Sequence, residues 1–514
     1  MNRGYRTVWN AALGACVAVA EDAKAPRGGA RGSKRAIGAK TALALAALGA
    51  AGISQAATFT VATEADLITA INAANTSTDP ASTITITSLM AITGPLPPVQ
   101  SNVTISNTNV TAIESKGGAL LNIQAGATYS GAIIRIGNTA GTSGSLIVQG
   151  ADSKVTGTTL SALEGQTNIS VLDGESLSVP SGIFLGGSAA ATNGGVANVA
   201  VSGTNSRITS TVGYHHHSGT LEVSGGGLVS SKIMALGAFA GDSVTALVTG
   251  DGSRLSSVGI AIGVGAAGTA TVTVAEGGTL SGNNGTTAIN LAANATGVAT
   301  LNIGAAVGGA AVAPGTVVAS KINGGLGTAV VNFNHNASAY DFATPITGST
   351  SVNHVGSGTT TLTGVSDYTG ATNVAGGTLR AGAASVLCSA SAHTVAAGGT
   401  LDLNGFEQTL SSLSNAGTVS LQGSAPGNTL TVTGAYVGNG GTLRLGTALG
   451  DSSSASDRLV LSGPAASATG STRIQVTNLG GLGGLTTGNG IEVVTATGGA
   501  TTTAQSTKDG FAPA

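Results

Sequence analysis

The sequence predicts an all-β protein, a right-handed parallel β-helix with a short helix capping its amino-terminal end. Three observations lead to this prediction. The chain has 514 residues, of which 82 are glycine, 3% aromatic and 8% charged. Short stretches alternate aliphatic residues with Thr, Ser or Asn, as strands with one buried face do. Related strings recur at multiples of one short spacing, which is typical of a solenoid.

The glycine and serine content alone would also fit a disordered chain. Disordered chains combine low hydrophobicity with high charge. Here the mean hydropathy is +0.33 and charged residues are few. Val, Ile, Leu and Thr pack well on a pleated surface. An ordered β protein with many turns is therefore the better prediction.

Residues 1–56 are predicted to be a secretory signal and not part of the mature fold. A basic region precedes an apolar run over residues 41–53, and small residues follow at the cleavage site between Ala56 and Ala57. The apolar run has 13 residues. As a helix it would span about 20 Å, short of the ~30 Å hydrocarbon core of a bilayer. It is therefore not expected to anchor the chain in a membrane.

Charge limits the classes of partner that the exported part of the chain is expected to bind, and the cysteine count bears on its core. Residues 1–56 hold eight Lys and Arg and two acidic residues, whereas the rest holds 12 basic and 20 acidic residues. A mildly acidic chain without a basic cluster argues against nucleic acid and against a polybasic mode of membrane binding. Cys388 is the single cysteine outside the signal, and we expect it to be a small buried hydrophobe.

A helix is expected directly after the first mature strand, which covers residues 59–61. Thr63 has the N-cap position, and Asp66 stands three residues later, as in a capping box. The residues that follow place one apolar face on the helix: Leu67, Ile68, Ile71 and Ala74. The first coil of a solenoid is open and apolar, so this helix is predicted to cover it.

Internal repeats set the length of one coil. The string that begins at Val201 and ends at Arg207–Ile208 recurs from Val248 and, more loosely, from Val148, so the starts lie 53 and 47 residues apart. Gly-Gly-Thr-Leu occurs at 376–379, 398–401 and 440–443, in steps of 22 and 42 residues. A β-propeller blade of ~40–50 residues fits the longer spacing. Related strings also recur at about 21–25 residues, and aromatic residues are scarce. Both observations favour the coils of a solenoid over the blades of a propeller.

Three regions of the chain resemble modules of type V secretion. Tyr5, Trp9, Asn10, the segment 17–19 and Glu21 resemble the extended signal peptide of autotransporters. Residues 356–387 resemble the autotransporter-associated β-strand repeat. Segments 401–413, 427–432 and 457–461 resemble the pertactin-like carboxyl-terminal region of passengers, which is implied to act as an autochaperone that folds first outside the cell.

The resemblance implies four regions: an extended signal peptide (1–56), a β-helical passenger (57–355), an autotransporter-associated β-strand repeat (356–391) and an autochaperone region (392–514). Such proteins continue into an outer-membrane translocator barrel. No alternating, aromatic-flanked strands of that kind occur before residue 514. The barrel is therefore expected to be missing from this chain, and its source stays open between truncation and a separate gene.

The sequence offers few candidates for chemistry, and no cofactor is expected. Of the adjacent histidines 215–217, His215 and His217 would share a strand face and are weak candidates for metal ligands. The alternative interpretation is that these histidines lie on a solvent-exposed edge of a coil. Asp173 and Glu175 would also share a strand face and are the one close pair of carboxylates considered as candidate catalytic residues. The Gly-x-Gly-x-x-Gly string at 263–268 precedes a strand and not the helix that a dinucleotide site needs.

The resemblance implies an exported passenger of a Gram-negative bacterium that crosses the periplasm and ends at the cell surface, outer membrane-associated or secreted. Its partners would be the Sec machinery, signal peptidase and an outer-membrane translocator. Adhesion, aggregation or a role in virulence is the expected function, through a host surface or self-association. Two alternatives stay open: a β-helical enzyme acting on polysaccharide, and a filament exported by two-partner secretion.

Overall fold

The structure of the protein is a computed structural model. It describes residues 5–10, 15–20, 56–77, 81–100, 103–107, 113–115, 119–137, 140–187, 194–502 and 511–513. The chain divides into two compact units, residues 1–53 and 54–514. In the first unit, β1 (Tyr5–Asn10) and β2 (Ala15–Ala20) pair antiparallel. The apolar run at 41–53 lies outside the described residues.

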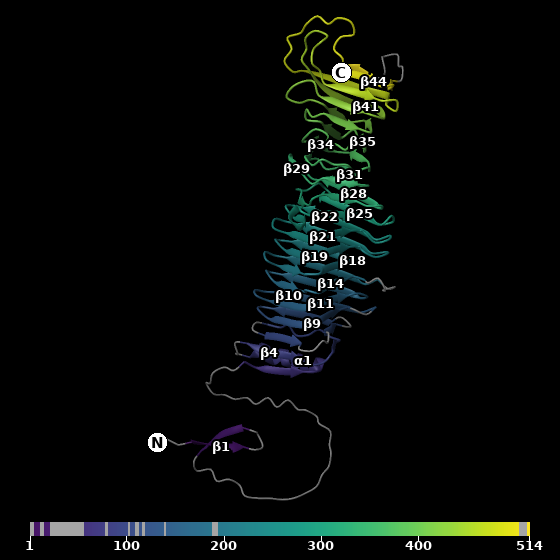
Figure 1. Cartoon of the computed structure of the whole chain (residues 1–514). Helices are drawn as coiled ribbons and strands as arrows, with labels where there is room; N and C mark the ends of the chain where they lie inside the picture. The colour runs from purple at the N-terminus through teal and green to yellow at the C-terminus, as the bar shows by residue number, and fades with distance from the viewer. Residues whose placement is uncertain are drawn as a thin grey trace. The chain divides into compact units, whose positions relative to one another are not determined.

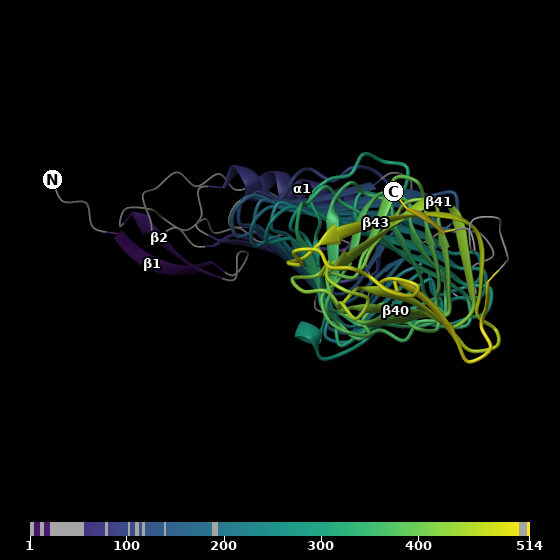
Figure 2. The same ribbon diagram turned by 90° about the horizontal axis from the view of Figure 1, so that it is seen from above.

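The second unit is a parallel β-helix, as predicted (Figure 1). Each coil pairs in register with the next, for example Leu146 with Ile169 and Ile169 with Val199. This parallel stacking excludes the propeller, whose blades are antiparallel. Viewed along the stack, the coils lie over one another (Figure 2). In the described part of the chain, no helix is long and apolar enough to cross a bilayer.

Two long sheets and one short sheet form the walls of the solenoid. Sheet 1 consists of β3 (Thr58–Val61), β4 (Ser82–Ile86), β5 (Met90–Ile92), β6 (Val103–Asn107), β7 (Ile113–Ser115), β9 (Thr128–Ile136), β11 (Lys154–Ala162), β13 (Ser176–Ser178), β14 (Gly182–Leu185), β16 (Arg207–Thr209), β17 (Gly213–His216), β19 (Leu228–Leu236), β21 (Arg254–Ile262), β23 (Thr279–Gly282), β24 (Ile289–Leu291), β26 (Thr316–Val318), β27 (Ile322–Gly324) and β30 (Ile346–Gly348).

Sheet 2 consists of β8 (Ala119–Gln124), β10 (Ser143–Gln149), β12 (Gln166–Leu172), β15 (Val196–Ser202), β18 (Ser218–Ser224), β20 (Ser243–Thr249), β22 (Thr269–Ala275), β25 (Val298–Gly304), β28 (Thr328–Asn334), β29 (Tyr340–Phe342), β31 (Ser351–His354), β32 (Thr359–Leu362), β33 (Thr372–Val374), β34 (Gly377–Ala381), β35 (Ala392–Val395), β36 (Gly399–Asp402), β38 (Ser412–Asn415), β39 (Thr418–Ser420), β41 (Ala435–Thr447), β43 (Ser467–Asn478), β45 (Thr501–Thr502) and β46 (Phe511–Pro513). Sheet 3 consists of β37 (Gln408–Leu410), β40 (Thr429–Val432), β42 (Arg458–Ser462) and β44 (Val494–Thr497).

The core follows from the alternation along each strand. In β20, Val244, Ala246 and Val248 are buried while the residues between them face outward. Successive coils stack these inward positions into one continuous aliphatic cluster. A short 3₁₀ turn, η1 (Asn283–Gly285), interrupts this pattern after β23.

The amino-terminal helix α1 (Glu64–Thr76) forms where the sequence predicts it. The backbone amide of Asp66 donates to Thr63 Oγ1 at 3.2 Å, which confirms the N-cap. Leu67, Ile71 and Ala74 are buried, and the helix packs against β3 to β6. The Glu64 carboxylate accepts from the backbone amides of residues 93 and 94, at 2.8 and 2.9 Å, and so fixes the start of the helix to the second coil.

Candidate interaction surface

An uninterrupted column of hydroxyl side chains runs down the outer face of sheet 1. Each member pairs in register with the next coil, and the column, here called the hydroxyl ladder, consists of Thr60, Thr85, Ser106, Ser130, Thr156, Ser178, Thr209, Ser230, Ser256 and Ser281. Thr85 and Ser106 are 3.4 Å apart at their hydroxyl oxygens. The spacing of the hydroxyls is the coil spacing, about 4.8 Å.

A second column lies two residues before the ladder on the same strands. It is threonine in the first coils and then carries three basic side chains, Lys154, Arg207 and Arg254. Ser176 stands between the first two and Leu228 between the last two. These three residues, here called the basic column, stand next to last in the repeated strings of the sequence. The 53- and 47-residue spacings of those strings therefore correspond to two coils each, of 23 and 30 residues and of 22 and 25 residues.

A shallow groove of about 290 Å³ opens on this face where sheet 1 bends. Hydroxyl groups, amides and one cation line it, in the set Ser210, Ser230, Ser231, Lys232, Ser256, Ser257, Val258, Asn283 and Asn284. Lys232 is exposed, as are the apolar residues Val212, Ile233 and Val258 beside it. The groove therefore offers many hydrogen-bonding groups and an apolar rim.

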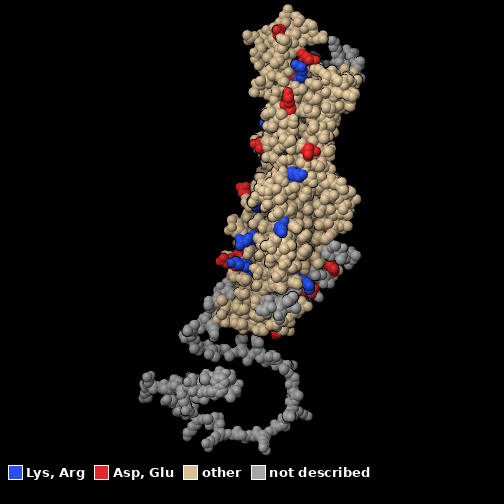
Figure 3. Space-filling model, viewed as in Figure 1, with Lys and Arg blue, Asp and Glu red and all other residues tan. Residues whose placement is uncertain are grey.

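Sheet 2 carries a comparable ladder of asparagines. The side-chain amide of Asn332 donates to Asn302 Oδ1, that of Asn353 to Asn332, and that of Asn373 to Asn353, at 2.8 to 2.9 Å. Each amide thus donates to one coil and accepts from the next. Figure 3 shows the charged side chains as scattered points on a surface that is mostly uncharged.

The adjacent histidines form part of a stack of rings. Phe184 and His215 are stacked with ring centroids 5.1 Å apart, and His217 and Phe239 with centroids 4.6 Å apart. A Cβ on Gly213 would lie 2.6 Å from His215 Nε2, so glycine is needed for this ring to lie along the strand. Burial and the neighbouring His217 imidazole lower the pKa of His215 below its ordinary value.

The histidine candidates share one side of the coil, as expected; His217 is buried and not a solvated edge, whereas His215 is partly exposed. The rings of His215 and His217 are 6.4 Å apart. His217 is 2% exposed, and its Nδ1 lies 3.0 Å from Asp242 Oδ2. His216 points inward, with Nε2 2.9 Å from the carbonyl of Ala197. No group of three metal-binding side chains occurs among the described residues.

The expected carboxylate pair does not share a strand face. Asp173 and Glu175 lie in the turn between β12 and β13, because Asp173 adopts a left-handed conformation with φ of 62°. Asp173 is exposed, whereas Glu175 is 2% exposed. Burial raises the pKa of Glu175, and so does the nearby Asp152 carboxylate. The strand alternation assumed from sequence fails here because the turn starts earlier.

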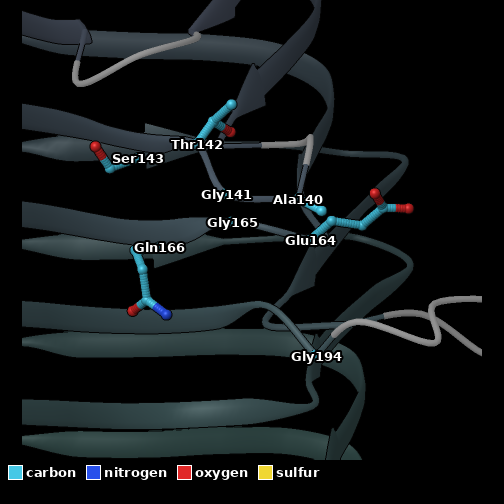
Figure 4. A pocket seen from close by; sticks show the side chains of 8 residues that line it. All are labelled: Ala140, Gly141, Thr142, Ser143, Glu164, Gly165, Gln166 and Gly194. Atoms are coloured by element: carbon cyan, nitrogen blue, oxygen red, sulfur yellow. The ribbon is translucent and has the colours of Figure 1, made fainter.

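A second hollow of about 440 Å³ lies on another turn of the solenoid. Figure 4 shows its lining, residues 140–143, 164–166 and Gly194, spread over successive coils. Half of these residues are glycine or alanine, and Glu164 is the single ionisable group. This hollow brings no reactive side chains together.

Neither ladder was recognised from sequence, although each leaves a trace in it. The asparagines recur as an Asn between two inward-facing residues, at 302, 332, 353 and 373. The basic column corresponds to the next-to-last residue of the repeated strings, and those strings by themselves indicate only the coil length. Assigning these residues to one face requires the coil-to-coil register.

Comparison with known families agrees with this architecture. Residues 1–51 match the Extended Signal Peptide of Type V secretion system, residues 355–381 the Passenger-associated-transport-repeat, and residues 408–510 the Autochaperone Domain Type 1. On these matches and the fold, the chain is an autotransporter passenger of type V secretion. It is exported, to the cell surface or into the medium, in a Gram-negative bacterium.

Three curated proteins are similar to parts of the chain. YuaQ of Escherichia coli K12 is 37% identical over 168 residues, 32% of this chain and 12% of YuaQ. The adhesin BmaC autotransporter of Brucella suis biovar 1 is 38% identical over 119 residues, 22% of this chain and 3% of BmaC. YdeU of Escherichia coli K12 is 41% identical over 73 residues, 14% of this chain and 15% of YdeU. The chain thus spans a small part of each relative.

The matched modules also imply partners for export. An extended signal peptide and a passenger imply the Sec machinery and an outer-membrane translocator. The predicted cleavage site, Ala56–Ala57, lies just before β3, at the start of the second unit. Cleavage there would release the β-helix without removing any of its strands, and it stays a prediction.

Proposed function

We propose that the exported β-helix serves adhesion or cell–cell aggregation through its uncharged polar faces. The observation that carries this proposal is the hydroxyl ladder, which presents nine exposed or half-buried side chains on nine successive coils and ends at the buried Ser281. A single solvent-exposed hydrogen bond adds little free energy, about 1 kcal/mol. A regular array makes many such bonds at once when the partner is also extended.

Two further points support the proposal. The similarity to BmaC, which is named an adhesin, covers 119 residues. Low charge also favours close approach of two such surfaces, because few charged groups must lose their hydration. Either a second passenger or a polymer on another cell would provide an extended partner.

The test is to display the chain on a non-aggregating Escherichia coli strain by fusing it to a translocator. We expect displaying cells to sediment faster than cells with the translocator alone, or to be retained on a surface to which the control does not adhere. Mixing labelled displaying cells with unlabelled non-displaying cells separates self-association from binding to another partner. Equal sedimentation and equal retention of the two strains would contradict the proposal.

Charge substitutions identify the face that is used. Thr156→Glu with Thr209→Glu places two carboxylates on the hydroxyl ladder, whereas Thr220→Glu with Thr245→Glu places two on the outer face of sheet 2. If the hydroxyl ladder is the contact surface, the first pair should reduce aggregation or retention and the second should leave it unchanged. Similar loss with both pairs would indicate a non-specific effect of charge.

A further inference from the structure

The basic column differs from the other cations of the surface in its regularity. Lys154, Arg207 and Arg254 are aligned along sheet 1 with one coil between successive members. Two coils correspond to about 10 Å, twice the strand spacing in a sheet. The hydroxyl ladder runs parallel to this column on the same strands, and Lys232 stands in the groove beside it.

These cations have no ion-pair partners among the described residues. The side-chain ion pairs found there involve other groups: His217 with Asp242, Arg380 with Asp402, and Arg458 with Glu492. Arg254 Nη2 donates to Ser281 Oγ at 2.8 Å and also contacts Asn284 Oδ1. Neutral acceptors thus orient the guanidinium and leave its charge uncompensated.

Acidic residues lie to one side of the basic column and define its edge. The turn that leads into sheet 1 carries the exposed residues Asp152, Asp173, Asp251 and Glu276. None lies within ion-pair distance of the column in the described structure. A negatively charged ligand is therefore directed away from the turn and toward the hydroxyl ladder and the groove.

We propose that this face binds a linear polysaccharide with one carboxylate or sulfate group per disaccharide. An extended disaccharide advances by nearly the distance of two coils, so successive negative groups would meet Lys154, Arg207 and Arg254 in turn. The sugar hydroxyls between them would exchange hydrogen bonds with the hydroxyl ladder. This inference rests on the proposed adhesive function and names the chemistry of its partner.

The spacing argues against nucleic acid as the polyanion. Each DNA strand carries one phosphate per about 3.4 Å of axis, so cations about 10 Å apart would leave most phosphates uncompensated. Binding of single strands also relies on aromatic side chains for base stacking. Ser and Thr line the ladder instead, and they suit a polymer rich in hydroxyl groups.

The test measures binding of the exported chain to immobilised hyaluronan, keratan sulfate and uncharged dextran. Hyaluronan carries one carboxylate per disaccharide and no sulfate, whereas keratan sulfate carries sulfate and no carboxylate, so the two arms separate the two anions. We expect binding to at least one polyanion, weaker binding at higher salt, and little binding to dextran. The combined variant Lys154→Gln, Arg207→Gln and Arg254→Gln should bind about tenfold more weakly, since three exposed charge contacts of ~0.5 kcal/mol each amount to about 1.5 kcal/mol.

A matched variant controls for net charge. Lys321→Gln, Arg444→Gln and Arg473→Gln remove three exposed cations that do not belong to the basic column. This control should bind like the wild type, and circular dichroism should show the same β content in all three proteins. Unchanged binding of the basic-column variant, equal loss in the control, or equal binding to dextran would overturn the proposal.

Failure of the polysaccharide inference can be distinguished from failure of the proposed adhesive function. If displayed cells aggregate or adhere, and the basic-column variant does so equally well, adhesion stands and the polysaccharide inference fails. If displayed cells neither aggregate nor adhere, the proposed function fails, while the purified chain still reports whether the face binds a polyanion.

Discussion

The amino-terminal and carboxyl-terminal coils bury different kinds of side chain. From β9 to β25 the inward positions are mainly Val, Ile, Leu and Ala, interrupted by a buried polar pair in which Tyr214 OH lies 3.2 Å from His216 Nδ1. From β28 onward hydrogen-bonded polar networks recur in the interior of successive coils. His335 Nε2 and His354 Nε2 lie 2.7 and 3.1 Å from Thr360 Oγ1, and Tyr368 OH lies 2.7 Å from Thr372 Oγ1.

This difference bears on what determines the register between successive coils. Aliphatic coils resemble one another, so a slip by one coil would still bury apolar side chains. A buried polar group is costly unless its own partner is present, so a slip in the carboxyl-terminal coils would leave donors and acceptors unpaired. We infer that these coils set the register and that the aliphatic coils then stack on them. This agrees with the match to an autochaperone domain over residues 408–510.

Deleting residues 392–505 is the strongest test of this comparison. We expect the remaining coils to become protease-sensitive, because the networks that specify register are lost together with the stacking surface for the coils before them. Limited proteolysis followed by mass spectrometry measures the effect. Deleting residues 143–165 puts Gln166 in the place of its register partner Ser143 and so removes one aliphatic coil. This deletion should leave a resistant core. Full resistance of the 392–505 deletion would contradict the autochaperone hypothesis.

Asp457 offers the next largest effect within the carboxyl-terminal coils. Its buried carboxylate accepts backbone amides from Gly427 and Asn428 at 2.9 Å and from Gly446 at 2.7 Å. Asp457→Ala leaves these donors unpaired, and we expect a loss of about 3–5 kcal/mol in the free energy of unfolding. Urea denaturation followed by circular dichroism measures it. Asp451→Ala, at an exposed position, should leave the urea midpoint almost unchanged.

The fold was largely predictable from sequence because its determinants are local. Alternation of Val, Ile and Thr identified the strands, Thr63 and Asp66 located the start of α1, and the repeated glycines gave the approximate coil length. Burial of Cys388 was also predicted correctly, and its Sγ lies 2.7 Å from the carbonyl of Tyr368.

The ladders were not predictable because coil length varies. Asn168 and Asn198 are neighbours on adjacent coils at a separation of 30 residues, whereas Asn198 and Thr220 are neighbours at 22 residues. Insertions in the turns cause this variation, so sequence spacing does not reveal which residues share a column. The turn at Asp173 was missed for a related reason, because its left-handed backbone is not encoded by glycine.

Acid should weaken the carboxyl-terminal coils more than the amino-terminal ones. Burial lowers the pKa of His335 and His393 to about 4 and lowers that of His354. The unfolded chain has histidine pKa values near 6.5, so it binds more protons than the folded chain between pH 4 and 6.5. Stability is therefore fully present above about pH 6.5 and is lost as pH falls toward 4.

His393→Leu isolates one of these contributions. His393 Nε2 has no partner among the described residues, so leucine should be tolerated at pH 7.5. We expect the variant to lose less stability than the wild type between pH 7.5 and pH 5, as measured by urea midpoints. His216→Leu provides the amino-terminal counterpart, since burial also lowers the pKa of His216 to about 4. Identical pH dependence in His393→Leu and the wild type would show that His393 is not buried neutral.

Substitutions in the turns of the amino-terminal coils are expected to have the smallest effect on stability. They give the clearest contrast with substitutions in the buried polar networks of the carboxyl-terminal coils. Ser206 Oγ accepts from the backbone amide of Gly174 at 2.9 Å and donates to the carbonyl of Ser202 at 2.7 Å, and Ser153 makes the equivalent contacts two coils earlier. Ser206→Ala should cost about 1–2 kcal/mol in unfolding free energy, while the exposed Thr204→Ala should cost less. Because this bond joins only adjacent coils, Ser206→Ala should increase proteolysis near residue 206 and leave the carboxyl-terminal coils resistant. A loss as large as that of Asp457→Ala, or one that reaches the carboxyl-terminal coils, would mean that register depends on the turns as much as on the buried networks.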